Sequence, residues 1–364
     1  MKRSFCFFLL LLVTVCGYTQ GSPTKALVDS IRKYRNTPGL VYAVFTSDKI
    51  IDSGVSGIKK MQVKDFIQFS NRFNIGTTTT AFTCYIAAKM VQEGKIAWNS
   101  NIGKTFPEFD GKIMKLYNRV TLEQLLGQRA GFPPFEEFKE YRDIHSMPGN
   151  PTQQRQAFAL MMMKKRPNLV VDSSEAIYSI AGTAIAAAML EKVSKKSWEQ
   201  LVDIYINKPL NIKADFGFPV LKDSTQPWGH WDNYFTLTAH TDDYWARCFT
   251  PIAPTGNINL CMSDFIVFIR DYLNALHNKK SSISNALANK LLFGQKGYAL
   301  GWANMRWNGL NIAYWSGRGG LFSSYVEIIK EKNMAIVIMD NSGATDGRSA
   351  ASNLGRALRN YYAH

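Results

Sequence analysis

The sequence has few cysteines and, beyond its first residues, no apolar run near the roughly 20 residues of a membrane-spanning helix. Cys6 and Cys16 lie close to the N-terminus, which leaves Cys84, Cys248 and Cys261 as an odd, widely spaced set. This set excludes a disulfide framework and matches no zinc-binding pattern. Whether Cys248 and Cys261 form a bridge stays open, because buried free thiols are the other interpretation.

Several functional signatures are also missing. There is no G-x-S-x-G elbow, P-loop or dinucleotide fingerprint, and we find no internal repeat. His230, His240 and Asp242 are spaced only as a loose metal set, so we expect no metal and no cofactor.

Acidic residues are fewer than basic ones, 28 against 43, and the formal net charge is +15. The basic residues are spread along the chain and do not form the basic, aromatic stripe typical of a nucleic-acid binder. We therefore expect no nucleic-acid partner. The excess charge fits a lysine-rich solvated surface, an anionic cell-envelope surface or a small anionic or peptide ligand.

Residues 1–19 have the three-part pattern of a secretory signal peptide. Lys2 and Arg3 precede an apolar stretch at 5–15, and small and polar residues follow it. The pattern predicts cleavage and export to the periplasm or the medium, with no transmembrane segment in the mature chain. A lipid anchor at Cys16 is the alternative, which the bulky Val15 before it disfavours.

Strand patterns near both ends enclose a helix-rich middle. β-rich runs occur at 39–45, 50–55, 313–315, 325–329 and 335–339, and helical patterns occur at 26–34, 81–94, 181–193 and 349–362. Capping boxes at Thr121 and Ser197 predict two more helices, the first ending near Gly131.

This order predicts an α+β fold in which one antiparallel sheet, built from both termini, is flanked by helices and carries an inserted helical subdomain. We place the domain at 20–364. Its α/β part covers about 22–80 and 297–364, and its mainly helical part covers about 81–296.

Four threonines, residues 77–80, stand at the start of the predicted helix. The segment 73–82 around them resembles the first conserved block of the serine β-lactamase and penicillin-binding-protein superfamily, in particular its β-lactamase-related esterases and D-alanyl peptidases. Further similar segments follow in order at 91–96, 102–108, 121–133, 298–302 and 317–324. The resemblance implies a β-lactamase/transpeptidase-like fold.

The resemblance also implies three catalytic motifs, and this chain departs from each of them. The nucleophilic serine and the lysine three residues later fall on Thr77 and Thr80; a hydroxyl remains, but the amine that would take its proton does not. The second motif keeps a tyrosine for proton transfer, Tyr178, while Ile180 replaces a polar asparagine. In the third, Trp315 replaces a lysine or histidine, and Ser316 and Gly317 follow it.

The resemblance further implies a ligand site formed by Gln128, Ile180, Trp315, Ser316, Gly317 and Arg318. Relatives have histidine in place of Gln128. The Arg318 side chain could hold a carboxylate or be merely solvated, and the backbone near Ser316 could form an oxyanion hole with the amide of Thr77. The residues also allow simpler roles, namely Thr77 as a helix cap, Tyr178 as a core aromatic and Trp315 as a space filler.

Three functions fit these observations. The first is a pseudoenzyme that keeps its ligand cleft without efficient acyl transfer, and the loss of three polar groups at Thr80, Ile180 and Trp315 favours it. The second is a divergent esterase, peptidase or β-lactamase with Thr77 as nucleophile and Tyr178 as base. The third is a structural or adaptor protein of the cell envelope. The sequence identifies neither the ligand nor the oligomeric state.

Overall fold

The computed structural model describes residues 22–364 except 136–137, 169–174, 233–236, 241–248 and 344–348. The expected signal peptide, Cys16, Asp242 and Cys248 lie outside the described residues. Within the described part, no helix combines the length and the hydropathy that crossing a membrane requires.

A six-stranded antiparallel sheet joins the two ends of the chain, as predicted. Its spatial order is β2 (Ile50–Gly57), β1 (Gly39–Thr46), β11 (Met334–Asp340), β10 (Ser323–Ile329), β9 (Leu310–Arg318) and β8 (Ala303–Trp307). The N-terminal hairpin meets the C-terminal strands at β1 and β11, where Val41 pairs with Met339. The predicted strand runs all lie within these strands.

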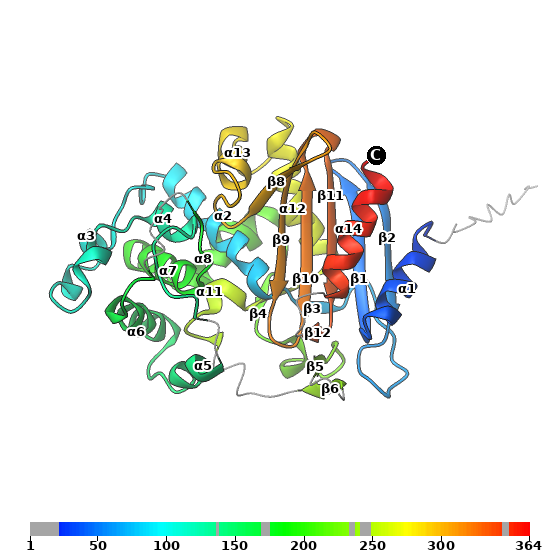
Figure 1. Cartoon of the computed structure of the whole chain (residues 1–364), viewed down its shortest axis with the longest axis horizontal. Helices are drawn as coiled ribbons and strands as arrows, with labels where there is room; N and C mark the ends of the chain where they lie inside the picture. The colour runs from blue at the N-terminus through cyan, green and yellow to red at the C-terminus, as the bar shows by residue number, and fades with distance from the viewer. Residues whose placement is uncertain (1–21, 136–137, 169–174, 233–236, 241–248, 344–348) are drawn as a thin grey trace, which may run out of the picture.

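Helices cover both faces of this sheet. On one face lie α1 (Lys25–Tyr34) and α14 (Ala350–Tyr362), and on the other lies α12 (Met262–Leu276) (Figure 1). Alternating side chains of β1 supply the two cores, because successive residues of a strand point to opposite faces. Leu40 and Tyr42 pack toward α1 and α14, whereas Val41 and Ala43 join the large core on the other side.

The remaining helices form a lobe beside the sheet (Figure 1). They are α2 (Thr79–Gln92), α3 (Ile102–Thr105), α4 (Leu122–Leu126), α5 (Phe138–Ile144), α6 (Pro151–Lys164), α7 (Ile180–Ser194), α8 (Trp198–Val202), α9 (Lys208–Leu210), α11 (Ala253–Gly256) and α13 (Asn285–Phe293). Both predicted capping boxes are confirmed, at Thr121 and at Ser197. The first helix ends at Leu126 and not near Gly131, because Gly127 closes its last turn.

Two small sheets complete the fold, and the sequence predicts neither of them. One contains β3 (Arg72–Asn74), β7 (Ile258–Cys261) and β4 (Asp215–Phe216), and the other contains β12 (Ser342–Gly343), β5 (Gly229–Asp232) and β6 (Leu237–His240). The pairing of β3 with β7 matters most, because β3 leads directly into the threonine run.

Candidate functional site

The threonine run begins where the chain leaves β3 and touches the end of β9. A 3-10 turn, η1 (Gly76–Thr78), precedes α2, so the run lies at a helix start as predicted. Gly76 has a φ of +53°, and a Cβ atom there would lie 2.1 Å from the carbonyl carbon of Arg318. Only glycine fits such a backbone contact without displacement. The turn is thereby held against the segment that carries the third motif.

The four threonine hydroxyls have four different environments. Thr77 Oγ1 accepts a hydrogen bond from Trp315 Nε1 at 3.1 Å. Thr78 Oγ1 lies 2.8 Å from Ser324 Oγ on β10, and Thr79 Oγ1 accepts from the backbone of Ile258 at 3.2 Å. Thr80 is fully buried, and its Oγ1 has no hydrogen-bond partner among the described residues.

None of these hydroxyls caps the helix. Neither η1 nor α2 has a side-chain hydrogen bond at its N-cap, where Ile75 and Thr78 stand. The interpretation of Thr77 as a helix cap is therefore wrong. Its hydroxyl connects to β9 instead, which a pattern of local spacing could not predict.

Trp315, which donates to Thr77, belongs to an aromatic cluster. Its ring centroid lies 5.3 Å from that of Tyr178 and 5.4 Å from that of Tyr298. The backbone amide of Arg318 also points at Thr77 Oγ1, at 3.4 Å. Both groups donate, and among the described residues none accepts a hydrogen bond from Thr77 Oγ1. Among the described residues, the geometry thus holds this hydroxyl as an acceptor.

Gln128 forms hydrogen bonds with the backbone on both sides of Tyr178 in the second motif. It has a φ of +59°, and its backbone oxygen accepts from Ile177 at 2.9 Å while its Oε1 accepts from the amide of Ser179 at 2.8 Å. Ser179 then caps α7, whose first residue is Ile180. The Ile180 side chain is buried and adds no polar group. These bonds give Gln128 a positioning role for the segment that carries Tyr178.

The side chains of the third motif lie on both faces of β9. Trp315 faces Thr77, whereas Ser316 Oγ lies 2.7 Å from Ser352 Oγ on α14 and so points to the opposite face. Gly317 faces the threonine run again, and a Cβ there would lie 2.3 Å from the carbonyl oxygen of Ile75. The Arg318 side chain is exposed, and its backbone completes the contact with Gly76.

Tyr298 belongs to this cluster, although the sequence did not indicate it as a site residue. Its ring packs edge-on against Trp315, and burial raises the pKa of its hydroxyl well above the usual value. Arg129 Nη1 donates to its backbone oxygen at 3.0 Å. The only signal in the sequence is that Tyr298 opens one of the segments that resemble the family.

Of the loose metal set, His230 is the residue whose side chain the structure describes. His230 is buried; its Nδ1 lies 2.9 Å from the carbonyl oxygen of Asn341, and its Nε2 accepts from the amide of Met61 at 3.1 Å. Both ring nitrogens are thus used within the protein. The described residues contain no group of three potential metal ligands, and Cys84 and Cys261 carry free thiols.

Known proteins resemble this chain in sequence and in fold. A protein of Salmonella typhimurium named "Putative D-alanyl-D-alanine carboxypeptidase" is 27% identical over 159 residues, which cover 43% of this chain and 36% of that protein. The chain thus spans about a third of the length of this relative.

Two solved structures share the fold. The octameric penicillin-binding protein homologue from Pyrococcus abyssi matches 93% of this chain and 76% of its own, with a TM-score of 0.74 at 21% identity. The structure of SurE with D-Leu matches 87% of this chain and 70% of its own, with a TM-score of 0.66 at 17% identity.

The family model described as Beta-lactamase matches residues 24–359, which is nearly the whole chain. The sheet built from both termini and the penicillin-binding-protein-like neighbours are consistent with this match. The chain belongs to the beta-lactamase family.

Proposed function

We propose that this protein is a beta-lactamase-family pseudoenzyme, which keeps a ligand-binding site but has lost efficient acyl transfer. One observation carries the proposal: Trp315, at the position of a family lysine or histidine, donates its indole hydrogen to Thr77 Oγ1. An indole nitrogen only donates and carries no charge. The Thr77 hydroxyl, which is the expected nucleophile, therefore faces a neutral hydrogen-bond donor. Acyl transfer would need a group there that accepts a proton or carries a positive charge.

The other two substitutions act in the same direction. Thr80 places a short, buried hydroxyl where the family lysine would stand, and Ile180 places a buried hydrocarbon where an asparagine would stand. Losing a general base alone lowers a rate by about 10²- to 10⁴-fold. Without the amine and both polar partners, turnover should fall to the background of the assay.

Hydrolysis assays test this proposal. We expect the purified protein to hydrolyse a chromogenic ester and a chromogenic β-lactam no faster than a Thr77→Ala variant. The comparison is clean because the same fold and the same aromatic cluster are present in both proteins. Turnover at least about tenfold above the variant would refute the proposal and favour the divergent hydrolase, since Tyr178 packs on the ring that touches Thr77.

The ligand class is proposed from the relatives. One neighbour was solved with D-Leu, and the Salmonella relative carries a D-alanyl-D-alanine carboxypeptidase name. Peptides that end in a D-amino acid are accordingly the first ligands to test. A thermal shift with such a peptide supports binding, and a shift that persists in Trp315→Ala would place the ligand elsewhere. If no small ligand shifts the melting temperature, the adaptor function is favoured.

We also propose that the protein is exported. The support is the N-terminal pattern, in which Lys2 and Arg3 precede the apolar stretch 5–15. Cell fractionation with mass analysis should find the protein outside the cytoplasm, without about its first 19 residues. A full-length cytoplasmic product would contradict export, and a mass increase from acyl chains on Cys16 would indicate the lipid anchor.

A further inference from the structure

A closed loop after β2 carries exposed apolar and basic side chains together. We call residues 59–66 the basic loop. An isolated bridge pairs Ile58 with Phe66, and the amide of Lys59 donates to the carbonyl oxygen of Asp65 at 2.7 Å. Phe66 is 66% exposed and Val63 is 45% exposed, although both are large hydrophobic residues. These bonds give the loop a defined shape that presents two apolar side chains to solvent.

The lysines of the basic loop differ in their surroundings. Lys59 is buried and forms an ion pair with Asp65 at 3.0 Å, so its charge is balanced. Lys60 Nζ lies 3.4 Å from the ring centroid of Trp228, and Lys64 is exposed. The loop thus carries both apolar and cationic groups at its surface.

Helix α1 adds more positive charge on the same side. The basic loop projects at the lower edge of the molecule in Figure 1, beside the C-terminal end of α1. That end carries Arg32, Lys33 and Arg35, and the neighbouring Tyr34 is 81% exposed. The only acidic residue of α1, Asp29, is already engaged by Lys25 at 2.8 Å and by Ser56. The combined surface therefore has an excess of cations.

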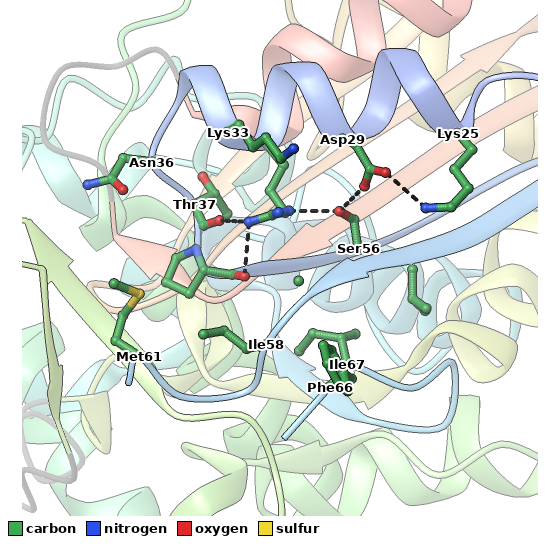
Figure 2. Close-up of a pocket in the computed structure, with 14 residues that line it drawn as sticks. Lys25, Asp29, Lys33, Asn36, Thr37, Ser56, Ile58, Met61, Phe66 and Ile67 are labelled. Carbon is green, nitrogen blue, oxygen red and sulfur yellow. Dashed lines mark hydrogen bonds and ion pairs between the residues drawn. The ribbon is translucent and has the colours of Figure 1, made fainter. Parts of the chain in front are cut away.

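A hollow of about 610 Å³ separates α1 from the basic loop. Figure 2 shows Lys25 and Lys33 on the helix side and Phe66 and Ile67 on the opposite side. Arg32 lies inside this wall, where its Nε donates to Ser56 Oγ at 2.7 Å and its Nη1 donates to the carbonyl oxygen of Thr37 at 3.0 Å. One wall is thus cationic and rigid, and the other is apolar.

We propose that α1 and the basic loop form a peripheral docking surface for a bilayer that contains anionic phospholipids. Val63 and Phe66 enter the headgroup region, where aromatic and apolar side chains are favourable, while Lys33, Lys60 and Lys64 contact the lipid phosphates. This inference rests on the proposed export and selects the anionic envelope surface among the partners that fit the excess charge. It is independent of whether Thr77 reacts.

Vesicle sedimentation tests the surface. The protein is the chain from Ser22 onward, which contains every described helix and strand, so that the apolar stretch 5–15 cannot itself bind lipid. We expect binding to phosphatidylcholine vesicles that contain phosphatidylglycerol, weakening as salt rises, and no binding to phosphatidylcholine alone.

Two sets of substitutions separate the contributions. Lys60→Glu with Lys64→Glu should weaken binding at least about 25-fold, because each surface lysine contributes about fivefold. Phe66→Ala should weaken it about tenfold through the lost apolar contact. Thermal unfolding of each variant verifies that the fold persists.

The control makes the same chemical changes at the opposite end of the molecule, in the segment that follows α3 (Figure 1). Lys112, Lys115 and Leu116 are exposed there, so Lys112→Glu with Lys115→Glu makes the same change in charge, and Leu116→Ala also removes an exposed apolar side chain. We expect less than a twofold effect. The proposal is overturned if the control loses as much affinity as the loop variants, if the wild-type protein ignores anionic vesicles, or if the loop variants alter self-association instead of lipid binding.

Discussion

Replacing Thr80 by lysine is expected to destabilise the protein by about 3–5 kcal/mol, because it buries a charge without a partner. Thr80 is completely inaccessible, and its own hydroxyl finds no partner among the described residues. Burial without hydrogen-bond acceptors lowers the pKa of an ammonium group, so the new lysine would tend to lose its proton.

Chemical denaturation of Thr80→Lys measures this cost, and Thr80→Val is the matched control. Valine has nearly the shape of threonine and removes an unsatisfied hydroxyl, so we expect it to be neutral or stabilising. Thr79→Val offers the contrast within the same run: it deprives the amide of Ile258 of its acceptor and should cost about 1–3 kcal/mol. If Thr80→Lys unfolds at the same denaturant concentration as the wild type, the site still contains acceptors for the amine.

A second large effect is expected at Arg155, which is completely buried between three helices. From α6 it donates to Glu191 on α7 at 2.7 Å and to Glu199 on α8 at 2.9 Å. Arg155→Met leaves Glu191 as a buried carboxylate without its cation, and such a loss costs about 3–5 kcal/mol. Because these helices include α7, whose first residue is Ile180 of the second motif, the loss should also loosen the segment of Tyr178.

A double variant separates the charge from the packing. Glu191→Gln in the Arg155→Met background removes the orphaned carboxylate, while the amide oxygen can still accept from the amide of Trp198. We expect this double variant to recover about 1–3 kcal/mol relative to Arg155→Met, as measured by urea unfolding. Equal stability of Arg155→Met and the wild type would show that the ion pair is dispensable.

Most of the large sheet and the helices α1, α2, α7 and α14 follow from the sequence because their patterns are local and repeated, whereas β8 and the long helices α6 and α12 are not predicted by it. Strands β1 and β11 contain long apolar runs, and the caps at Thr121 and Ser197 have a specific four-residue spacing. The two small sheets could not be predicted in this way. Their strands have two to four residues, too few for a pattern, and β3 meets β7 only because the fold brings distant segments together.

The candidate site shows the same limit. Position and residue type identify Thr77, Thr80 and Trp315 as altered family positions. What the sequence could not reveal is the bond between Trp315 and Thr77, which joins residues 238 positions apart. The direction of the Ser316 side chain could have been predicted from the sequence, because successive residues of a strand point to opposite faces and Ser316 follows Trp315. The packing of Tyr298 on Trp315 depends on tertiary structure alone.

The substitutions are expected to act together. Restoring Thr77→Ser and Thr80→Lys leaves Ile180 and Trp315 in place, so the indole still occupies the position of the third motif. This double variant should remain close to background in hydrolysis. Strong turnover would mean that Ile180 and Trp315 matter less than the missing lysine.

Intact-mass analysis after incubation with a reactive acylating β-lactam or ester tests the central claim most directly. The proposed pseudoenzyme should keep its unmodified mass, because the Thr77 hydroxyl accepts a hydrogen bond from Trp315 and no described residue takes its proton. Peptide mapping locates any added mass, and Thr77→Ala serves as the reference. A stoichiometric acyl adduct on Thr77 that is absent from Thr77→Ala would contradict the account and identify a working threonine nucleophile.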